Sequence, residues 1–446
     1  MLDVIVIGGG FSGVAAAKKL HENNVSFQLL EARDRLGGRV HTQHFEDGKM
    51  LEVGGQWIGP TQDRMYELVR EYGLTYFETY NEGINLLDIK GKIAKYKGLI
   101  PKLNPISLLS LEWMIRRLES MARKIDTQRP WKTPTANSWD HQTLEQFVKK
   151  NAWTSAAYQV MKAGLETVYA CELNEISLLH ALFYIRSGNN LNCLLSIEKG
   201  AQLHRIKEGM QTLIEKMAEP FMDQVLLDHP VQKILWSHDE VSIITDNKTL
   251  HAKKLILAIP PIQSSKICFE PSLPIRKKQL LDRIPMGIAG KVLFVYDRPF
   301  WRVNGYSGQV VSDQLTPFQT FFDVSPADGS FGVLLAFCLA DRARSFFSLD
   351  EESRKTEAIK YVSRYFGEQA THPTQYLDHN WASEPWSQGC YAGLYGTGNW
   401  TSFQNELANP TGAIHWAGTE TSDSWYGYIE GAVRAGERAA TEIVRS

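Results

Sequence analysis

The chain opens on a run of apolar residues that passes directly into glycines. Residues 3–7 read Asp-Val-Ile-Val-Ile, and an alanine-rich segment with helical spacing follows Gly13. A second apolar run, residues 25–30, ends on Glu31. Short apolar runs bounded by glycines predict buried strands. The succession of strand, helix and strand therefore predicts the first βαβ unit of a parallel sheet in an α/β fold.

The turn between this strand and this helix carries the spacing G-x-G-x-x-G, and an acid stands eighteen positions after its last glycine. In this context the spacing is the dinucleotide-binding fingerprint. Its glycines permit a tight turn, a close approach of the backbone to a pyrophosphate, and close packing of helix on strand. The start of the helix attracts phosphate, and the acid can accept hydrogen bonds from ribose hydroxyls. We assign to cofactor binding the residues Gly8, Gly10, Phe11, Ser12, Gly13 and Glu31.

The next two glycine pairs indicate which dinucleotide binds. Residues 32–40 place two adjacent glycines beside three arginines, which suits a backbone that lies against a second phosphate. Residues 51–57 form a strand that runs into Gly54-Gly55, where the backbone could reach a flat ring. A cofactor that stays bound needs more contacts than a nicotinamide that leaves after each turnover. We therefore predict FAD, held further by Ala32, Arg33, Gly38, Arg39, Gly54, Gly55 and Gln56.

The rest of the chain alternates between helical and strand patterns. Residues 80–199 are mostly helical in pattern, including 108–118 and 139–150. Strand signals follow at 225–227, 231–235 and 241–244, and residues 266–384 mix both patterns, with strands at 290–296 and 331–339. Apolar residues from Ile429 to Val444 recur at helical spacing and predict a final amphipathic helix.

Several segments resemble the flavin-dependent amine oxidases, the monoamine oxidase group. The matching segments are 31–39, 54–62, 200–206, 255–261, 386–391 and 417–437. The resemblance implies a Rossmann-type FAD-binding domain interleaved with an α+β substrate-binding domain. We expect the first domain to comprise 1–79, 200–265 and 385–446, and the second 80–199 and 266–384.

The resemblance also implies the residues that carry the chemistry. Lys291 lies in an apolar strand and matches the lysine that holds an ordered water near flavin N5. Tyr391 and Tyr428 match the paired tyrosines that flank the substrate amine, since electron-rich rings favour a polarised nitrogen. We assign catalytic roles to these three residues.

Further cofactor contacts follow from the same resemblance. Cys390, in Gly389-Cys390-Tyr391, matches a cysteine that is thioether-linked to the flavin 8α-methyl, although Gln388 replaces the usual glycine. Backbone at Val231 would hold the adenine, and the start of the last helix would face the flavin. The remaining expected cofactor contacts are Trp57, Trp386, Gly418, Glu420, Tyr428 and Ile429, with Trp425 nearby. For the substrate pocket we expect Phe321 and Phe322, with Tyr169 or Leu173.

The amino-acid composition limits the kinds of partner that we expect the protein to bind. A net charge of −2 gives no reason to expect nucleic acid. Five scattered cysteines indicate reduced thiols in a cytoplasmic protein, and twelve histidines without ligand spacing indicate no metal site. No stretch approaches 18 apolar residues, so we expect no membrane partner. Residues 103–118, with Trp113 and two arginines, would also suit a helix that lies on a membrane, but a helix that covers the substrate domain has the same pattern.

We therefore expect an FAD-dependent amine oxidase. Its oligomeric state stays open, with a homodimer as one option because members of the family are often dimers. A primary or secondary amine would pass a hydride equivalent to flavin N5, the imine would hydrolyse, and O2 would leave as H2O2. Two alternatives of the same fold stay open, an L-amino acid oxidase and a di- or polyamine oxidase. A di- or polyamine oxidase would need acidic residues at the entrance to its cavity, for which Glu166 and Glu172 are candidates. A desaturase, or an amine-binding protein with a structural flavin, stays open too.

Overall fold

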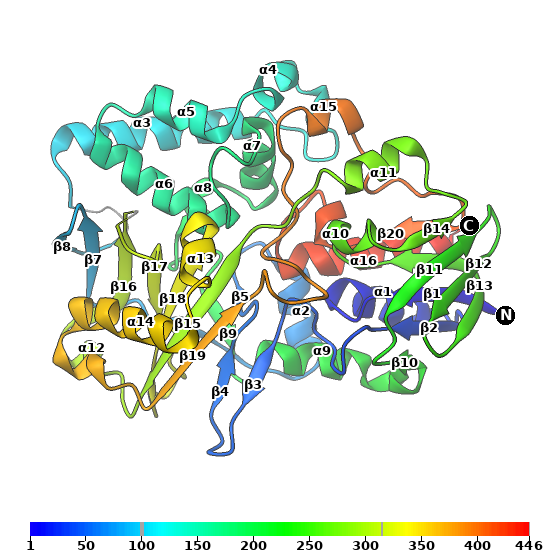
Figure 1. Cartoon of the computed structure of the whole chain (residues 1–446), viewed down its shortest axis with the longest axis horizontal. Helices are drawn as coiled ribbons and strands as arrows, with labels where there is room; N and C mark the ends of the chain where they lie inside the picture. Colours follow the sequence, from blue (N-terminus) through cyan, green and yellow to red (C-terminus); the bar gives the residue numbers. More distant parts are fainter. Residues whose placement is uncertain (99–101, 314, 446) are drawn as a thin grey trace.

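Two large sheets lie at opposite ends of an elongated molecule, with helices around and between them (Figure 1). The computed structural model describes residues 1–98, 102–313 and 315–445. The first sheet takes its strands from the two ends and the middle of the chain, and the second takes its strands from the parts between.

The first sheet begins with the predicted βαβ unit. Its eight strands run in the order β10-β2-β1-β13-β12-β11-β14, and β20 pairs with β13. They are β1 (Leu2–Ile7), β2 (Phe27–Leu30), β10 (Val225–Leu226), β11 (Val231–Trp236), β12 (Val241–Thr245), β13 (Thr249–Leu257), β14 (Cys268–Glu270) and β20 (Ile414–Trp416). The strands β10, β2, β1, β13 and β20 are parallel, as a βαβ connection requires.

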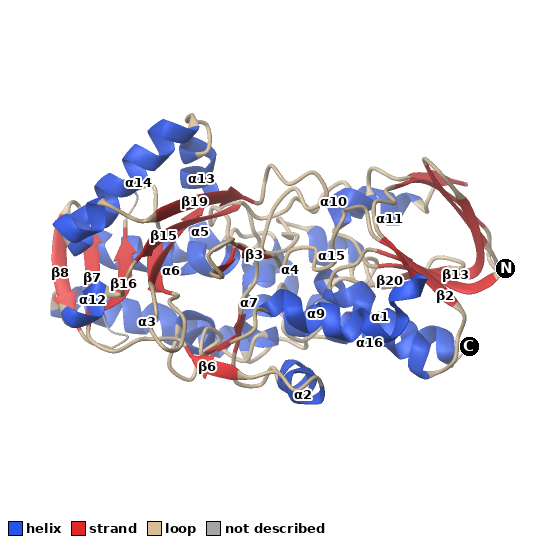
Figure 2. Cartoon of the chain, turned by 90° about the horizontal axis from the view of Figure 1, so that it is seen from below, coloured by secondary structure: helices blue, strands red, loops and turns tan. Residues whose placement is uncertain are grey.

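The first and last helices of the chain pack against each other beside this sheet (Figure 2). They are α1 (Phe11–Glu22) and α16 (Ile429–Val444), the predicted amphipathic helix. A Cβ atom at Gly436 would lie 1.9 Å from the Ser12 carbonyl oxygen, so only glycine allows this approach. Helix α9 (Met210–Ala218) packs against α1 as well.

The second sheet has the order β19-β15-β18-β17-β16-β7-β8. Its strands are β7 (Ile84–Ile89), β8 (Lys92–Tyr96), β15 (Ala289–Tyr296), β16 (Tyr306–Ser312), β17 (Thr320–Asp323), β18 (Gly332–Leu339) and β19 (Gln375–Asn380). One face packs on α13 (Ala340–Phe346) and α14 (Glu351–Phe366). The opposite face packs on residues of the first part of the chain, including Leu51 and Val53, and on Cys390. That second face builds the site described below.

The segment 80–199 is helical after its first two strands, β7 and β8, which the helical prediction missed. Its helices are α3 (Pro105–Ala122), α4 (Ala136–Asp140), α5 (Leu144–Asn151), α6 (Ser155–Tyr169), α7 (Leu178–Ser187) and α8 (Leu191–Leu195). The helix predicted over 139–150 is two helices. Thr143 caps α5 in a capping box with Gln146, which starts a new helix there.

Short elements connect these layers. They are β3 (Thr42–His44), β4 (Met50–Glu52), β5 (Trp57–Ile58), α2 (Asp63–Glu71), β6 (Tyr76–Glu78), β9 (His204–Ile206), α10 (Pro261–Ser264), α11 (Ile275–Leu281), α12 (Phe300–Val303) and α15 (Asn399–Phe403). Strand β14 pairs with β11, so we propose that the cofactor domain extends to Glu270 rather than ending at 265.

Candidate active site

One cavity of about 720 Å³ joins the fingerprint loop of the first sheet to the inner face of the second sheet. Its walls come from segments that lie far apart in the sequence. Gly8, Gly10 and Glu31 line one part, and Lys291 and Tyr391 line another. A long cavity of this kind suits a cofactor with two ends of different chemistry.

The fingerprint loop is held by its own acid. Oε2 of Glu31 accepts a hydrogen bond from the Gly9 N–H at 2.6 Å, and Oε1 accepts one from the Arg33 N–H at 3.0 Å. A Cβ atom at Gly13 would lie 1.8 Å from the Gly8 carbonyl oxygen, so the helix can start close to the strand only with glycine there. The first turn of α1 leaves N–H groups free for an anion.

Arg39 ties the loop after β2 to the end of the chain. Its Nη1 donates to Oε1 of Glu420 at 2.6 Å and to the Tyr391 carbonyl oxygen at 2.8 Å. Oε1 of Glu420 also accepts a hydrogen bond from the Gly393 N–H at 3.1 Å. Arg39 thereby fixes the backbone of a candidate catalytic tyrosine.

Lys291 lies on β15, which is an interior strand between β19 and β18, and its side chain is buried. Its ammonium donates to the carbonyl oxygens of Glu52 at 3.0 Å and Gly54 at 2.5 Å, and to Oε1 of Gln56 at 3.3 Å. Burial lowers the pKa of Lys291 to about 7, against the opposing effect of the Glu52 carboxylate. Three acceptors from one short segment thus hold the lysine against the cavity wall.

Aromatic rings form the wall around Lys291. Tyr391 packs edge-on against Phe337 with ring centroids 6.2 Å apart, and Trp57 packs edge-on against Phe322 at 5.6 Å. Burial raises the pKa of Tyr391 and of Tyr428 well above the ordinary value, so both phenols are neutral. Trp57, which we expected only beside the cofactor, therefore also contacts the rings of the second sheet.

Cys390 lines the cavity and is buried. Its N–H donates to the Gly287 carbonyl oxygen at 2.9 Å. Gln388, at the place of the usual glycine, has a φ of 52°, in the region that glycine adopts most easily. Burial raises the pKa of the Cys390 thiol to about 12, so the thiol is protonated at neutral pH.

Of the residues to which the sequence analysis assigned catalytic or cofactor-binding roles, all but two line this cavity. Gly13 is buried beneath the fingerprint loop, and Glu420 lies behind Arg39. The sequence analysis missed several lining residues, namely Thr167, Val168, Tyr184, Gln202, Ala289, Phe337, Trp381, Thr419 and Gly427. The last two adjoin predicted residues, whereas Thr167, Val168 and Tyr184 lie on helices whose sequence carries no such signal.

Three of the four expected pocket residues are not cavity residues. Phe322 lines the cavity, but Phe321, its neighbour on β17, points to the opposite face and packs in the core beneath α14. Alternation along a strand requires this separation. Tyr169 donates its hydroxyl to the Ala181 carbonyl oxygen at 3.0 Å, and Leu173 is fully buried in the helical core.

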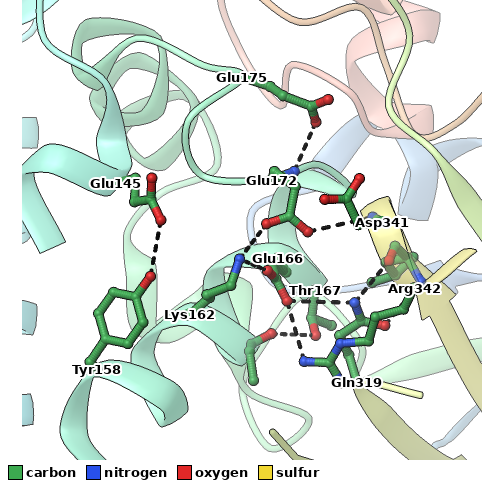
Figure 3. Close-up of polar contacts among 12 residues, drawn as sticks. Glu145, Tyr158, Lys162, Glu166, Thr167, Glu172, Glu175, Gln319, Asp341 and Arg342 are labelled. Atoms are coloured by element: carbon green, nitrogen blue, oxygen red, sulfur yellow. Dashed lines mark hydrogen bonds and ion pairs between the residues drawn. The ribbon is translucent and has the colours of Figure 1, made fainter. Parts of the chain in front are cut away.

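The two acids considered as entrance acids belong to a charge network around Lys162 (Figure 3). Lys162 bridges Glu166 and Glu172, and Arg342 lies 3.5 Å from Glu166. Neither glutamate lines the cavity. Because both carboxylates are paired with buried cations, they do not present free negative charge to an entering amine.

The residues present fit FAD. The fingerprint end offers a helix start and a fixed acid, and a Cβ atom at Gly10 would meet no atom of the surrounding chain closer than 3.9 Å, so the glycine lines the cavity without crowding it. At the other end, Gly55 and Ile429 line the cavity together with the aromatic wall, and a Cβ atom at Gly55 would lie 3.4 Å from the Ile429 side chain. Pyrophosphate, ribose and a planar ring each find a matching surface in one cavity.

The chain matches known proteins along its whole length. The family model described as flavin containing amine oxidoreductase matches residues 11–444. Amine oxidase [flavin-containing] B of Sus scrofa is 37% identical over 100% of this chain and 86% of its own length. Amine oxidase [flavin-containing] of Oncorhynchus mykiss is 37% identical over 99% of this chain and 85% of its own length.

Solved structures agree with this match. Putrescine oxidase bound to putrescine has a TM-score of 0.96 at 30% identity, with 100% of this chain and 99% of that chain covered. Cyclohexylamine oxidase from Brevibacterium oxydans IH-35A has a TM-score of 0.96 at 28% identity over the same shares. The interleaved FAD-binding fold that the sequence predicts is therefore confirmed, and the chain belongs to the family of flavin-containing amine oxidoreductases, as an FAD-dependent enzyme that oxidises amines and reduces O2 to H2O2.

Proposed function

We propose that the substrate is a compact, apolar primary or secondary monoamine. The observation that carries this proposal is the chemistry of the cavity wall around Lys291. Trp57, Phe322, Phe337, Tyr391 and Tyr428 supply aromatic surface there. The only carboxylates that line the cavity in the described part of the chain are Glu31, beside the fingerprint, and Asp246, after β12.

A diamine fits this wall poorly. Its second ammonium would be buried against aromatic rings with no acid to pair with, which costs several kcal/mol. Putrescine oxidase is named for a diamine. A shared fold does not imply a shared substrate, so this likeness does not make the present chain a diamine oxidase. Glu166 and Glu172, already paired with Lys162, do not change this.

An L-amino acid fits poorly as well, because its carboxylate needs a free cation. Of the arginines and lysines that line the described cavity, Arg33 bonds to Ser387, Arg39 bonds to Glu420 and Lys291 bonds to carbonyl oxygens. Lys266 lies with Val231 and Asp246 at the other end. This distribution supports a substrate without a carboxylate.

We propose the following roles for the site residues. When bound, the flavin supplies the electron acceptor for the amine C–H bond and returns the electrons to O2. Tyr391 and Tyr428 present neutral rings that orient a deprotonated amine nitrogen. Lys291 holds its ammonium beside the same wall, where it can stabilise negative charge that develops on O2. The rings exclude water from the reacting atoms.

We also propose that Cys390 forms a thioether with the flavin 8α-methyl group. The geometry that supports this is a buried cavity thiol in a loop where Gln388 has a positive φ, a conformation that glycine adopts most easily. Joining a thiol to a methyl group removes two electrons and two protons, which O2 can accept as H2O2.

The remaining expectations stay proposals. No helix of the described residues is long and apolar enough to cross a membrane. All five cysteines are free, which supports a reducing compartment such as the cytoplasm. A homodimer is expected from the family resemblance, and light scattering tests it.

Peroxide formation with matched substrates tests the proposed substrate class. We expect kcat/KM for 2-phenylethylamine to exceed that for L-phenylalanine, which adds only a carboxylate, by about tenfold or more. Butylamine should exceed 1,4-diaminobutane by a similar factor. A preference for the diamine or the amino acid would contradict the proposal while leaving the amine oxidase family intact.

A further inference from the structure

Helix α3 has two apolar faces, and only one of them is covered. Leu111, Met114 and Leu118 are buried in the helical core. On the other face, Ile106, Leu109 and Trp113 are 61%, 62% and 44% exposed. Their spacing of three and four residues places them in one stripe along the helix. Helix α3 itself lies at the outer edge of the molecule (Figure 1).

A second tryptophan extends this stripe from another segment. Trp153 follows α5 and is 56% exposed. Its backbone N–H donates to Oγ of Ser110, on α3, at 2.9 Å, so it stands beside the stripe. We call Ile106, Leu109, Trp113 and Trp153 the α3 face. Tryptophan is favoured where one side of a surface is apolar and the other is wet.

Positive charge surrounds the α3 face. Residues 102–153 contain nine lysines or arginines and five acids, whereas the whole chain has a net charge of −2. The guanidinium of Arg117 lies over the Trp113 ring, 5.7 Å from its centroid. Among the described residues, Arg117, Arg123, Lys124 and Lys150 form no ion pair with an acid. These cations are therefore available to an anionic partner.

A polar groove of about 630 Å³ runs along the same helix. Arg116, Arg123 and Arg186 line it together with Asn189, Asn190 and Asn192. Of its two acids, Glu112 pairs with Arg116, and Glu119 accepts a hydrogen bond from the Leu191 N–H. The groove thus places arginine and amide donors beside the apolar stripe, a combination that suits a phosphate group next to acyl chains.

A second copy of the chain is a poor occupant of this face. Stable dimers bury about 800 Å² on each partner, more than four half-exposed side chains can supply. A symmetric contact would also bring the cations of the two copies together, which opposes association. A bilayer with anionic head groups satisfies both the stripe and its charged rim.

We propose that the α3 face docks on the surface of an anionic lipid bilayer. The ring of Trp113 and its apolar neighbours enter the head-group region, while Arg123 and Arg186, which line the groove without an acid partner in the described part of the chain, bind phosphate. The contact is peripheral and reversible, because one short stripe supplies little buried area. It requires no spanning helix, and it is independent of which amine the enzyme oxidises.

Co-sedimentation of the holoenzyme with vesicles tests the proposal. We expect binding to vesicles of phosphatidylcholine with 30% phosphatidylglycerol, roughly that fraction being enough to give a negative surface potential. Binding should fall in 1 M salt, which screens the charges. Trp113→Asp with Trp153→Asp should lower the bound fraction about tenfold or more. The matched control is Ile275→Asp with Val303→Asp, two residues that are 67% and 82% exposed on other faces.

Each outcome decides the proposal. Amine oxidation in the absence of vesicles should be unchanged in both variants, which shows that both fold. Loss of vesicle binding in the tryptophan variant alone supports docking of the α3 face on the bilayer. No binding to the anionic vesicles, or equal binding by both variants, would overturn it. A dimer that the tryptophan substitutions dissociate in light scattering would also overturn it, by assigning the face to a second copy.

Discussion

Arg39 and Glu420 stand 381 positions apart in the sequence, and Nη1 of Arg39 lies 2.6 Å from Oε1 of Glu420. The carboxylate is almost fully buried, and the arginine also donates to the backbone of Tyr391. This pair therefore joins the loop after β2 to the last part of the chain, so that the cofactor loop and a candidate catalytic tyrosine keep a fixed relation.

Glu420→Gln should weaken this connection. Removing one partner of a buried pair leaves an uncompensated charge, so we expect the free energy of unfolding to fall by about 3 kcal/mol. The flavin content of the purified protein should fall as well. Urea denaturation and the ratio of flavin to protein absorbance measure both effects. The control is Glu112→Gln in the exposed pair with Arg116, which should cost less than about 1 kcal/mol; equal losses in the two variants would refute the role of the buried pair.

The charge of Lys291 should govern the reaction with O2. Because burial lowers its pKa to about 7, the ammonium is charged below this pH and neutral above it. We expect the rate constant for flavin reoxidation to fall as pH rises through about 7. Lys291→Met should be slower by roughly 100-fold and independent of pH in this range. Stopped-flow mixing of the reduced enzyme with O2 measures this, and an unchanged pH profile in the variant would contradict it.

Phe321 and Phe322 form a matched pair on β17, because one ring faces the core and the other faces the cavity. Phe321→Ala should lower the free energy of unfolding by about 3–5 kcal/mol and leave KM nearly unchanged. Phe322→Ala should change the relative kcat/KM of small and bulky amines, with a smaller cost in stability. Steady-state kinetics and denaturation of both variants measure this; the opposite assignment of effects would show that the two faces are reversed.

Cys390→Ser should release the cofactor from the chain. In the unaltered protein we expect the flavin to sediment with the polypeptide after acid precipitation, and in the variant we expect it in the supernatant. Mass spectrometry of the denatured chain gives the same answer as an added mass equal to that of FAD less the two hydrogen atoms lost when the thioether forms. Flavin that leaves the unaltered chain on acid treatment would show that Cys390 is only a buried thiol.

The parts of the fold that local sequence dictates were predicted well. The unit β1-α1-β2 and the helix α16 follow from apolar periodicity and glycine spacing, which act within a few residues. The strands β7 and β8 were missed, because β7 is held in the sheet by β16, which lies more than two hundred residues further along the chain, and β8 pairs only with β7 at the edge. Their stability comes from this pairing rather than from their own pattern.

The residues of the site fall into the same two groups, those that local sequence indicates and those that only the packing of distant segments brings together. Backbone that approaches a cofactor needs glycine, so Gly10, Gly38 and Gly55 could be identified from the sequence. Thr167, Val168 and Tyr184 line the cavity through the placement of α6 and α7, which nothing in their own residues records. The exposed side of α3 likewise could not be told from a buried one, since both faces carry apolar residues.

Anaerobic mixing of the purified holoenzyme with 2-phenylethylamine shows whether an apolar monoamine reduces the flavin. The absorbance band of oxidised flavin at roughly 450 nm reports electron transfer from the amine. We predict that the band bleaches before O2 is admitted, and that it recovers with formation of H2O2 afterwards. A flavin that dithionite reduces but that apolar monoamines leave oxidised would contradict the account.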